Sequence, residues 1–325
     1  MGDERCLICL GDLAAGEVSY HPECCREFFD SPQPPLLPYS QEDMDTLATN
    51  VIRQHVTVPG VQPKLSLHLE REAEKGTGRF TIVGLEGGYI LKPPVSRYPE
   101  MPELEHLTMR MASCFGIAAA SCGLLKMKDG RHAFIARRMD RSGLHKLPME
   151  DMCQLTDRLT ADKYRGSLES VGRAVLRYSD VPVFDVLRLF DLALFCFLTG
   201  NADMHLKNFS LLQNLDRETR LAPAYDLLPT HLLLPEDQEE SALTLHGKKR
   251  KINREDFLRF GEALTLNAKQ MDNALRRFAA GIPAALRLVD QGLCSATSKE
   301  RYRALVAFRA GRLGLTLPGR GEGAA

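Results

Sequence analysis

One nearly continuous apolar stretch, Val183–Thr199, constrains the fold of this chain more than any other feature. Only Asp185, Arg188 and Asp191 interrupt it, and these charges argue against a membrane span. A helix that is apolar nearly all round is typical of the centre of a domain rather than of its surface. The sequence therefore predicts a buried helix that ends at Gly200.

The sequence before and after this helix predicts an α+β fold. Alternating or short apolar runs predict strands, and they lie in the first half at Lys64–Glu70, Arg79–Val83, Tyr89–Lys92, Cys122–Met127 and His132–Arg138. Helices are expected at Met44–Arg53, Pro102–Phe115, Met149–Thr160, Ser167–Tyr178, Arg254–Thr265, Ala268–Ala279, Ile282–Gln291 and Ser298–Gly311, and a short hairpin at Phe209–Gln213 with Arg220–Ala224. Strands followed by helices fit two lobes with a cleft between them. The expected domains are a Cys/His-rich knob with a proline-rich linker (1–38), a strand-rich N-lobe (39–140), a helical C-lobe (141–317) and a flexible tail (318–325).

Composition excludes several classes of protein. The 325 residues include 42 Lys+Arg and 42 Asp+Glu, so the surface as a whole does not attract nucleic acid or an acidic membrane. No apolar run reaches the roughly 18 residues of a membrane span, and the N-terminus has no signal-peptide pattern. Nine cysteines, an odd number, suggest reduced thiols. We therefore expect a cytoplasmic protein.

The loop after the buried helix carries residues suited to phosphoryl transfer. Asp203 and Asn208 have the Asp-x4-Asn spacing of a kinase catalytic loop, where the Asp accepts the proton of an attacking hydroxyl and the Asn binds Mg²⁺. Lys207 would neutralise charge on the transferred group, and Asp226 would add a second metal carboxylate. The spacing alone also fits a polar loop that caps a helix. The ordered set of four residues favours phosphoryl transfer.

The strand-rich half supplies further groups for a nucleotide. Lys92 follows the apolar strand residues Tyr89–Leu91 and would pair with the α and β phosphates, with Glu105 as its acidic partner. Backbone N–H groups of Gly60–Ser66 would approach the phosphates. The candidate contacts in that segment are Gly60, Gln62 and Lys64. Taken singly, Lys92 also fits a solvated strand end, and the segment also fits an ordinary turn.

The first 30 residues are rich in Cys and His. Cys6 and Cys9, and His21 and Cys24, form two pairs with two residues between their members. Thiolates with an imidazole suit tetrahedral Zn²⁺, and a segment this small needs such a staple or docking to stay ordered. A structural zinc site and a group of buried free cysteines are the two interpretations.

Several segments occur in the order seen in HipA-family Ser/Thr kinases, the toxins of bacterial toxin–antitoxin systems. They are Thr57–Lys64, Ile90–Lys92, Glu105–Ala112, Gly200–Ser210 and Tyr225–Leu227. The chain resembles this family from about residue 50 to residue 315. The resemblance implies a kinase-like fold that uses ATP and Mg²⁺, with Asp203 as base, Asn208 and Asp226 on Mg²⁺, and Lys92 on ATP. It also matches Ala136–Asp140, including Arg138 and Met139, to the hinge that holds adenine.

The resemblance further implies regulation. Family members autophosphorylate a Ser just before the Gly-x-Gln loop, which ejects that loop and switches the kinase off. Thr57 occupies this position here, and Pro59 stands where some short members have a second Ser. Thr57 is therefore the predicted autophosphorylation site, with an ordinary β-branched strand residue as the alternative.

The segment before residue 50 does not resemble the extra N-terminal subdomain of HipA, so the match is closer to the short, HipT-like toxins. The resemblance implies a HipB-like helix-turn-helix antitoxin, a separate small HipS-like protein, and an aminoacyl-tRNA synthetase as substrate. Nucleic acid would be contacted only through the antitoxin. Two other functions stay open: a degenerate kinase that acts as an antitoxin-binding corepressor, and a small-molecule kinase.

Overall fold

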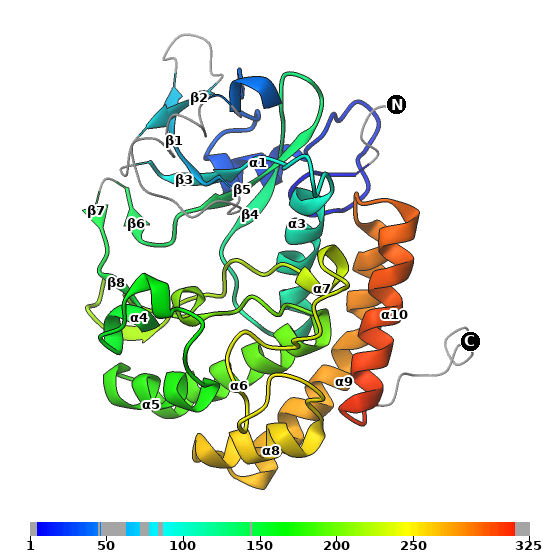
Figure 1. Cartoon of the computed structure of the whole chain (residues 1–325). Helices are drawn as coiled ribbons and strands as arrows, with labels where there is room; N and C mark the ends of the chain where they lie inside the picture. The colour runs from blue at the N-terminus through cyan, green and yellow to red at the C-terminus, as the bar shows by residue number, and fades with distance from the viewer. Residues whose placement is uncertain are drawn as a thin grey trace. The chain divides into compact units, whose positions relative to one another are not determined.

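The computed structural model describes residues 5–44, 46, 63–71, 78–83, 87–143 and 145–315. They belong to two compact units (Figure 1). The first comprises Met1–Leu107, Ala120–Met139 and Gln291–Cys294, and the second comprises Thr108–Ala119, Asp140–Asp290 and Ser295–Ala325. The Cys/His-rich knob thus groups with the strands. The domain limits predicted above stay a prediction.

A five-stranded antiparallel sheet is the centre of the first unit. Its strands are β1 (Leu65–Arg71), β2 (Gly78–Val83), β3 (Tyr89–Lys92), β4 (Cys122–Lys126) and β5 (His132–Arg137). Their order is β2-β1-β3-β5-β4, and every neighbouring pair is antiparallel. Each strand was predicted, because each alternates or is apolar between turn residues.

Aromatic rings fasten the N-terminal helix α1 (Pro22–Phe29) to this sheet. Phe28 and Phe29 at its end contact the ring of Tyr89 on β3, and Phe29 also contacts Phe80 on β2. The Tyr89 hydroxyl donates a hydrogen bond to the carbonyl of Phe28 over 2.9 Å. The helix therefore shares the core of the sheet.

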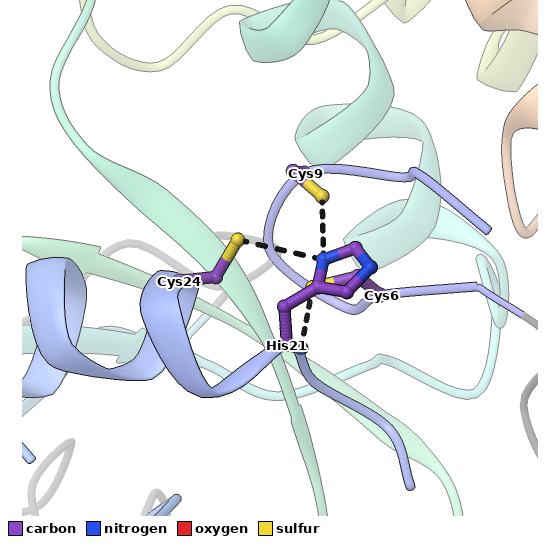
Figure 2. Close-up of side chains that lie close together, drawn as sticks. All are labelled: Cys6, Cys9, His21 and Cys24. Carbon is purple, nitrogen blue, oxygen red and sulfur yellow. Dashed lines mark hydrogen bonds between the residues drawn. The ribbon is translucent and has the colours of Figure 1, made fainter. Parts of the chain in front are cut away.

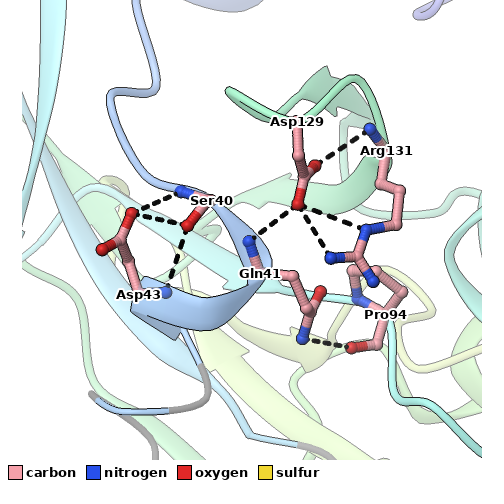
Figure 3. A network of polar contacts seen from close by, with 6 residues as sticks. All are labelled: Ser40, Gln41, Asp43, Pro94, Asp129 and Arg131. Carbon is pink, nitrogen blue, oxygen red and sulfur yellow. Dashed lines mark hydrogen bonds and ion pairs between the residues drawn. The ribbon is translucent and has the colours of Figure 1, made fainter.

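The proline-rich segment is not a free linker. Leu36 donates its N–H to Gly78 and accepts one from Phe80, which extends the sheet beyond β2. Farther along, the backbone N–H of Gln41 donates to Asp129 in the β4–β5 turn, and its side chain donates to the carbonyl of Pro94 (Figure 3). Hydrogen bonds of Leu36 and of the following Gln41 thus hold this part of the chain to the unit.

Helix α3 (Met101–Met111) starts in the first unit and ends in the second, where the 3-10 turn η1 (Ala112–Phe115) follows it. Gly116 is the C-cap of η1 and has the left-handed conformation, with φ of 73°. The predicted helix Pro102–Phe115 with its stop at Gly116 is confirmed.

The second unit is mostly helical. Its helices are α4 (Met152–Leu155), α5 (Leu168–Tyr178), α6 (Pro182–Thr199), α7 (Thr230–Leu233), α8 (Arg254–Ala263), α9 (Ala268–Gln291) and α10 (Ala296–Arg312), with 3-10 turns η2 (Thr160–Asp162) and η3 (Leu206–Asn208). A small antiparallel sheet has the order β10-β9-β8, from β8 (Met149–Asp151), β9 (Ser210–Gln213) and β10 (Thr219–Leu221). The two-residue strands β6 (Arg141–Ser142) and β7 (His145–Lys146) pair with each other.

Helix α6 is the buried helix that the sequence predicts. Its residues from Leu189 to Thr199 are all buried, and the Phe190 ring stacks on Phe260 of α8. The charges that interrupt it have partners: Asp185 pairs with Arg188, and Asp191 pairs with Arg277 of α9. Paired charges allow a helix with charged residues to lie at the centre of a unit.

Three predicted helices have the wrong bounds. Met149–Thr160 begins as strand β8, because residues 149–151 pair with β9, and the helix that follows covers only Met152–Leu155. The two helices predicted at Ala268–Ala279 and Ile282–Gln291 are one helix, α9, with Pro283 inside it. Gly281 lies inside that helix, and a Cβ there would lie only 2.4 Å from the carbonyl oxygen of Cys114. Close packing, rather than a stop, explains this glycine.

Two other predictions fall outside the described residues: most of the helix at Met44–Arg53, and the tail at 318–325. Among the residues that the structure covers, no helix has the length and apolar character to cross a membrane.

Candidate functional site

The candidate site of the second unit starts where α6 ends. Gly200 caps the helix with φ of 72°, and the next N–H, that of Asn201, returns to the carbonyl of Cys196 over 2.8 Å. A Cβ on Gly200 would lie 2.6 Å from Leu305 of α10. Both the left-handed backbone and the close packing require glycine here. The loop that follows therefore leaves a rigid helix in a fixed direction.

Hydrogen bonds within the loop hold Asp203 by its backbone. The side chain of Asn201 accepts from the N–H of Asp203 over 3.1 Å, and the Asn208 side-chain amide donates to the Asp203 carbonyl over 3.1 Å. Asn208 is buried, whereas Asp203 is half-buried. The five-residue spacing thus closes a short loop in which the backbone is fixed and the carboxylate reaches the surface.

Tyr164 contacts the carboxylate itself. Its hydroxyl donates to Oδ1 of Asp203 over 2.7 Å, and its ring meets that of His205 edge to face. Tyr164 is 44% exposed, and its partial burial, followed by the hydrogen bond to Asp203, raises its pKa, so the hydroxyl keeps its proton at neutral pH. Burial lowers the pKa of His205, so this ring is neutral beside the carboxylate.

Asp226 lies near the same groups. Its backbone has φ of 60°, a left-handed conformation that is uncommon for a non-glycine residue, and the Asn201 amide donates to its carbonyl over 3.4 Å. The negative charges of Asp203 and Asp226 both raise the pKa of Tyr164, and both oppose the lowering of the pKa of His205 by burial. The structure therefore brings the two predicted carboxylates into one electrostatic neighbourhood. Strained backbone of this kind is frequent at functional sites.

Lys207 has a partner that the sequence did not indicate. Its ammonium lies 2.6 Å from Oδ2 of Asp151, the N-cap residue of α4. The Lys207 carbonyl accepts from the hydroxyl of Tyr225, which precedes Asp226. These contacts tie the loop to both β8 and the segment of Asp226.

The first unit contains a buried ion pair. The ammonium of Lys92, at the end of β3, contacts the carboxylate of Glu105 on α3, and the two residues are 6% and 1% exposed. The ammonium also lies 5.3 Å from the centre of the Phe134 ring. A charge this deeply buried needs such a partner, and the pair fixes the lysine in one direction.

Comparison with known proteins identifies the family. The sequence profile described as the HipA-like C-terminal domain matches residues 56–286, which is more than half of the chain. This chain belongs to the HipA family.

Two relatives and one solved structure illustrate the likeness. A Haemophilus influenzae protein named as a candidate kinase is 28% identical over 260 residues, covering 72% of this chain and 74% of the relative. The serine/threonine-protein kinase toxin HipA of Shewanella oneidensis is 27% identical over 259 residues, covering 72% of this chain and 57% of that protein. The match thus spans little more than half of HipA's length.

The solved structure is the complex of Shewanella oneidensis HipA with HipB and its operator DNA. It matches with a TM-score of 0.65 at 22% identity, over 79% of this chain and 65% of that chain. At this identity the match shows the fold alone. The predicted α+β, HipA-like fold is confirmed.

The remaining residues implied by the HipA family are only partly described. Arg138 donates its N–H to the Gly88 carbonyl over 2.9 Å, and Lys64 precedes β1. Met139 is the last residue of the Ala120–Met139 part of the first unit. Thr57, Gly60 and Gln62 lie outside the described residues. All of these roles stay predictions.

Sequence reasoning missed three side chains of this candidate site: Tyr164, Asn201 and Asp151. Tyr164 and Asp151 lie far from the loop in sequence, so no local spacing points to them. Asn201 follows the capping glycine, where a polar residue is usual, and nothing in the pattern separates it from an ordinary cap.

Proposed function

We propose that this chain is a protein kinase that transfers phosphate from ATP to a Ser or Thr hydroxyl in the presence of Mg²⁺. The observation that carries the proposal is the loop after α6, in which the backbone of Asp203 is fixed and its carboxylate is half-buried. The buried Lys92–Glu105 pair adds the lysine that kinases use for the nucleotide phosphates. Relatives named as kinases support the same activity.

The donor atoms fit a magnesium ion. In this arrangement Nδ2 of Asn208 donates to a backbone carbonyl, which leaves Oδ1 as the metal ligand. The Asp226 carboxylate would be the second ligand, and hard oxygen donors of this kind are what Mg²⁺ prefers. When bound, the ion would offset negative charge on the phosphates.

The residues of the chain would act as follows. The carboxylate of Asp203 accepts the proton of the substrate hydroxyl as its oxygen attacks the γ-phosphorus and the bond to the ADP oxygen breaks. Tyr164 and the loop hydrogen bonds orient that carboxylate. Lys92, held by Glu105, binds the nucleotide phosphates. Lys207, which belongs to the same loop and pairs with Asp151, would offset part of the negative charge on the transferred group.

Transfer of labelled phosphate from ATP tests the proposal. Wild type with Mg²⁺ and a protein substrate, or with itself, should incorporate label, and Asp203→Ala should lose at least about a thousandfold in rate. Asp216→Ala, an exposed carboxylate in the β9–β10 turn, is the matched control and should keep full activity. Equal labelling by Asp203→Ala and wild type would overturn the proposal.

The biological setting proposed is that of a toxin with a HipB-like antitoxin. The solved HipA structure is a complex with HipB and operator DNA, which supports this partner class. An aminoacyl-tRNA synthetase as substrate, a HipS-like small protein as second partner, and autophosphorylation at Thr57 complete the proposal from the family resemblance. Phosphopeptide mapping after incubation with ATP distinguishes label on Thr57 from label on a substrate.

The same assays separate the rival functions. A degenerate kinase would bind ATP without Mg²⁺-dependent thermal stabilisation and would transfer no phosphate. A small-molecule kinase would consume ATP without labelling protein. Protein labelling that requires Asp203 excludes both.

A further inference from the structure

Four potential metal ligands of the first unit converge on one point. They are the sulfur atoms of Cys6, Cys9 and Cys24 and a ring nitrogen of His21, and all lie within 4.8 Å of one another (Figure 2). Nδ1 of His21 is 3.3 Å from Cys9 Sγ and 3.7 Å from Cys24 Sγ. In a tetrahedral zinc site with ordinary bond lengths, a nitrogen and a sulfur ligand lie about 3.5 Å apart. The spacing in the protein fits that geometry.

The backbone of the Cys6–Gly11 turn is shaped around the sulfur atoms. The N–H of Leu10 returns to the Cys6 carbonyl over 2.9 Å, and Leu10 adopts φ of 65°. The N–H of Gly11 then points at Cys9 Sγ over 3.4 Å, and that of His21 at Cys6 Sγ over 3.5 Å. Such N–H groups stabilise thiolates, the form of cysteine that binds metal.

The histidine is oriented for metal binding by its other nitrogen. Nε2 of His21 lies 3.0 Å from the carbonyl oxygen of Asp12 and 3.7 Å from the carboxylate of Glu17. Two acceptors fix the proton on Nε2, which donates to the Asp12 carbonyl. Nδ1 then presents its lone pair to the three sulfur atoms. A carbonyl behind a ligating imidazole is the usual support of a zinc-bound histidine.

The turn also joins the N-terminal segment to the rest of the unit. Between the two cysteines, the carbonyl of Leu7 accepts from the N–H of Leu124 on β4, and that of Ile8 accepts from Nε2 of His106 over 2.9 Å. Gly123 permits this approach, since a Cβ there would lie 3.1 Å from Ile8. His106 is fully buried and is the neighbour of Glu105 on α3.

We propose that Cys6, Cys9, His21 and Cys24 bind one structural Zn²⁺ ion, which holds the Cys6–Gly11 turn against β4 and α3. Three thiolates and one imidazole form a closed tetrahedral set, as in structural rather than catalytic zinc sites. Since the Ile8 carbonyl of this turn accepts a hydrogen bond from His106, the metal fixes the segment of α3 that carries Glu105. The proposal is independent of whether the chain is a kinase.

Elemental analysis of the wild-type protein tests it directly. Protein produced in zinc-supplemented medium and passed over a chelating resin should retain about one Zn²⁺ per chain. Replacement with Co²⁺ should give the visible bands of tetrahedral cobalt with thiolate-to-metal charge transfer. Absence of zinc and of these bands would overturn the proposal, as would a native mass showing a disulfide among Cys6, Cys9 and Cys24.

Variants locate the metal. Cys9→Ser and Cys24→Ser should each lower the retained zinc at least about tenfold. Cys25→Ala is the matched control, because Cys25 is adjacent in sequence and buried but lies outside the cluster, and its zinc content should stay unchanged. Equal loss of zinc from Cys25→Ala and Cys9→Ser would place the metal elsewhere. Since the wild-type measurement needs no substitution, misfolding of a variant does not decide the outcome.

The structural role has a separate readout. Removal of zinc with a strong chelator should increase amide hydrogen exchange at Leu124 by at least about tenfold, because the acceptor carbonyl of Leu7 would no longer be held. Exchange in α9, in the other unit, should not change. Unchanged protection of Leu124 after the metal is removed would contradict the anchoring role.

Discussion

The two units differ in how deeply they bury the charged side chains of the candidate site. In the first, Lys92 and Glu105 are almost wholly buried and satisfy each other as an ion pair. In the second, Asp203 is only half-buried, and its backbone rather than its carboxylate carries most of the hydrogen bonds. A lysine that positions phosphates profits from rigidity, whereas a carboxylate that accepts a proton must be reached by its substrate. The comparison predicts that the stability of the protein depends on the Lys92–Glu105 pair, whereas its rate of turnover depends on Asp203.

The largest expected effect is on the buried pair. Glu105→Ala would leave the Lys92 ammonium buried without its carboxylate, and the free energy of unfolding should fall by about 3–5 kcal/mol. Urea unfolding of the full chain measures this. Glu262→Ala, which removes a carboxylate that is 56% exposed, should change stability by less than about 1 kcal/mol. The double variant Lys92→Met with Glu105→Leu should recover most of the loss. If Glu105→Ala alone is as stable as wild type, the ion pair does not stabilise the first unit.

The pH dependence of stability tests a buried charge of the second unit, the Asp191 carboxylate on α6. Burial raises the pKa of Asp191 to about 6 from an ordinary 3.8, an effect that Arg277 only partly opposes. Because the folded state holds this proton more tightly, the group's contribution to stability declines as pH rises from about 4 to about 6, by roughly 3 kcal/mol at about 1.4 kcal/mol per pKa unit. Asp191→Asn should lack this decline. Unfolding free energies at pH 4.5 and pH 7 test it, and the same slope in both proteins would contradict it.

The glycine that starts the Gly200–Asn208 loop should matter for folding. Gly200→Ala places a Cβ in a left-handed residue and against Leu305, so we expect a loss of about 2 kcal/mol. Gly311→Ala in α10 is the control, since its Cβ would meet nothing within 4 Å, and helix propensity should make it neutral or slightly stabilising. Thermal unfolding compares the two. Equal midpoints would show that the loop does not depend on this cap.

The smallest effect concerns Tyr164, the tyrosine beside the Asp203 carboxylate. Tyr164→Phe deletes the hydrogen bond to Asp203, worth about 1 kcal/mol, and should lower kcat roughly fivefold with little change in the KM for ATP. Tyr178→Phe, another exposed tyrosine of the second unit, should leave both constants unchanged. A Tyr164→Phe enzyme that matches wild type would remove Tyr164 from the site.

The sequence predicts the parts of the fold that local chemistry determines. The apolar run of α6, the stop at Gly116 and the alternating strands are confirmed, because period and capping residues define them. The strand at Met149–Asp151 was missed because only its pairing with β9, some 60 residues later, makes it a strand. The break predicted between Ala279 and Ile282 is absent, because α9 continues through both predicted helices with Pro283 inside it.

The residues of the candidate site also fall into two groups, those that the sequence reveals and those that only the tertiary structure reveals. Asp203 and Asn208 could be found by spacing, and Glu105 as the partner of Lys92 by the order of segments. Tyr164 and Asp151 could not, since each reaches its partner through tertiary structure alone. In the N-terminal segment, spacing gave two equal interpretations. Convergence of the four ligand atoms is what favours zinc over free thiols.

The most direct test of the central claim is the single-turnover rate of phosphate transfer by wild type and Asp203→Asn, both saturated with ATP and Mg²⁺. We predict that both proteins have similar unfolding free energies and bind ATP with a similar Kd, whereas the transfer rate of the variant is at least about a thousandfold lower. Transfer at the wild-type rate by Asp203→Asn would contradict the assignment of Asp203 as the catalytic base of this HipA-family protein.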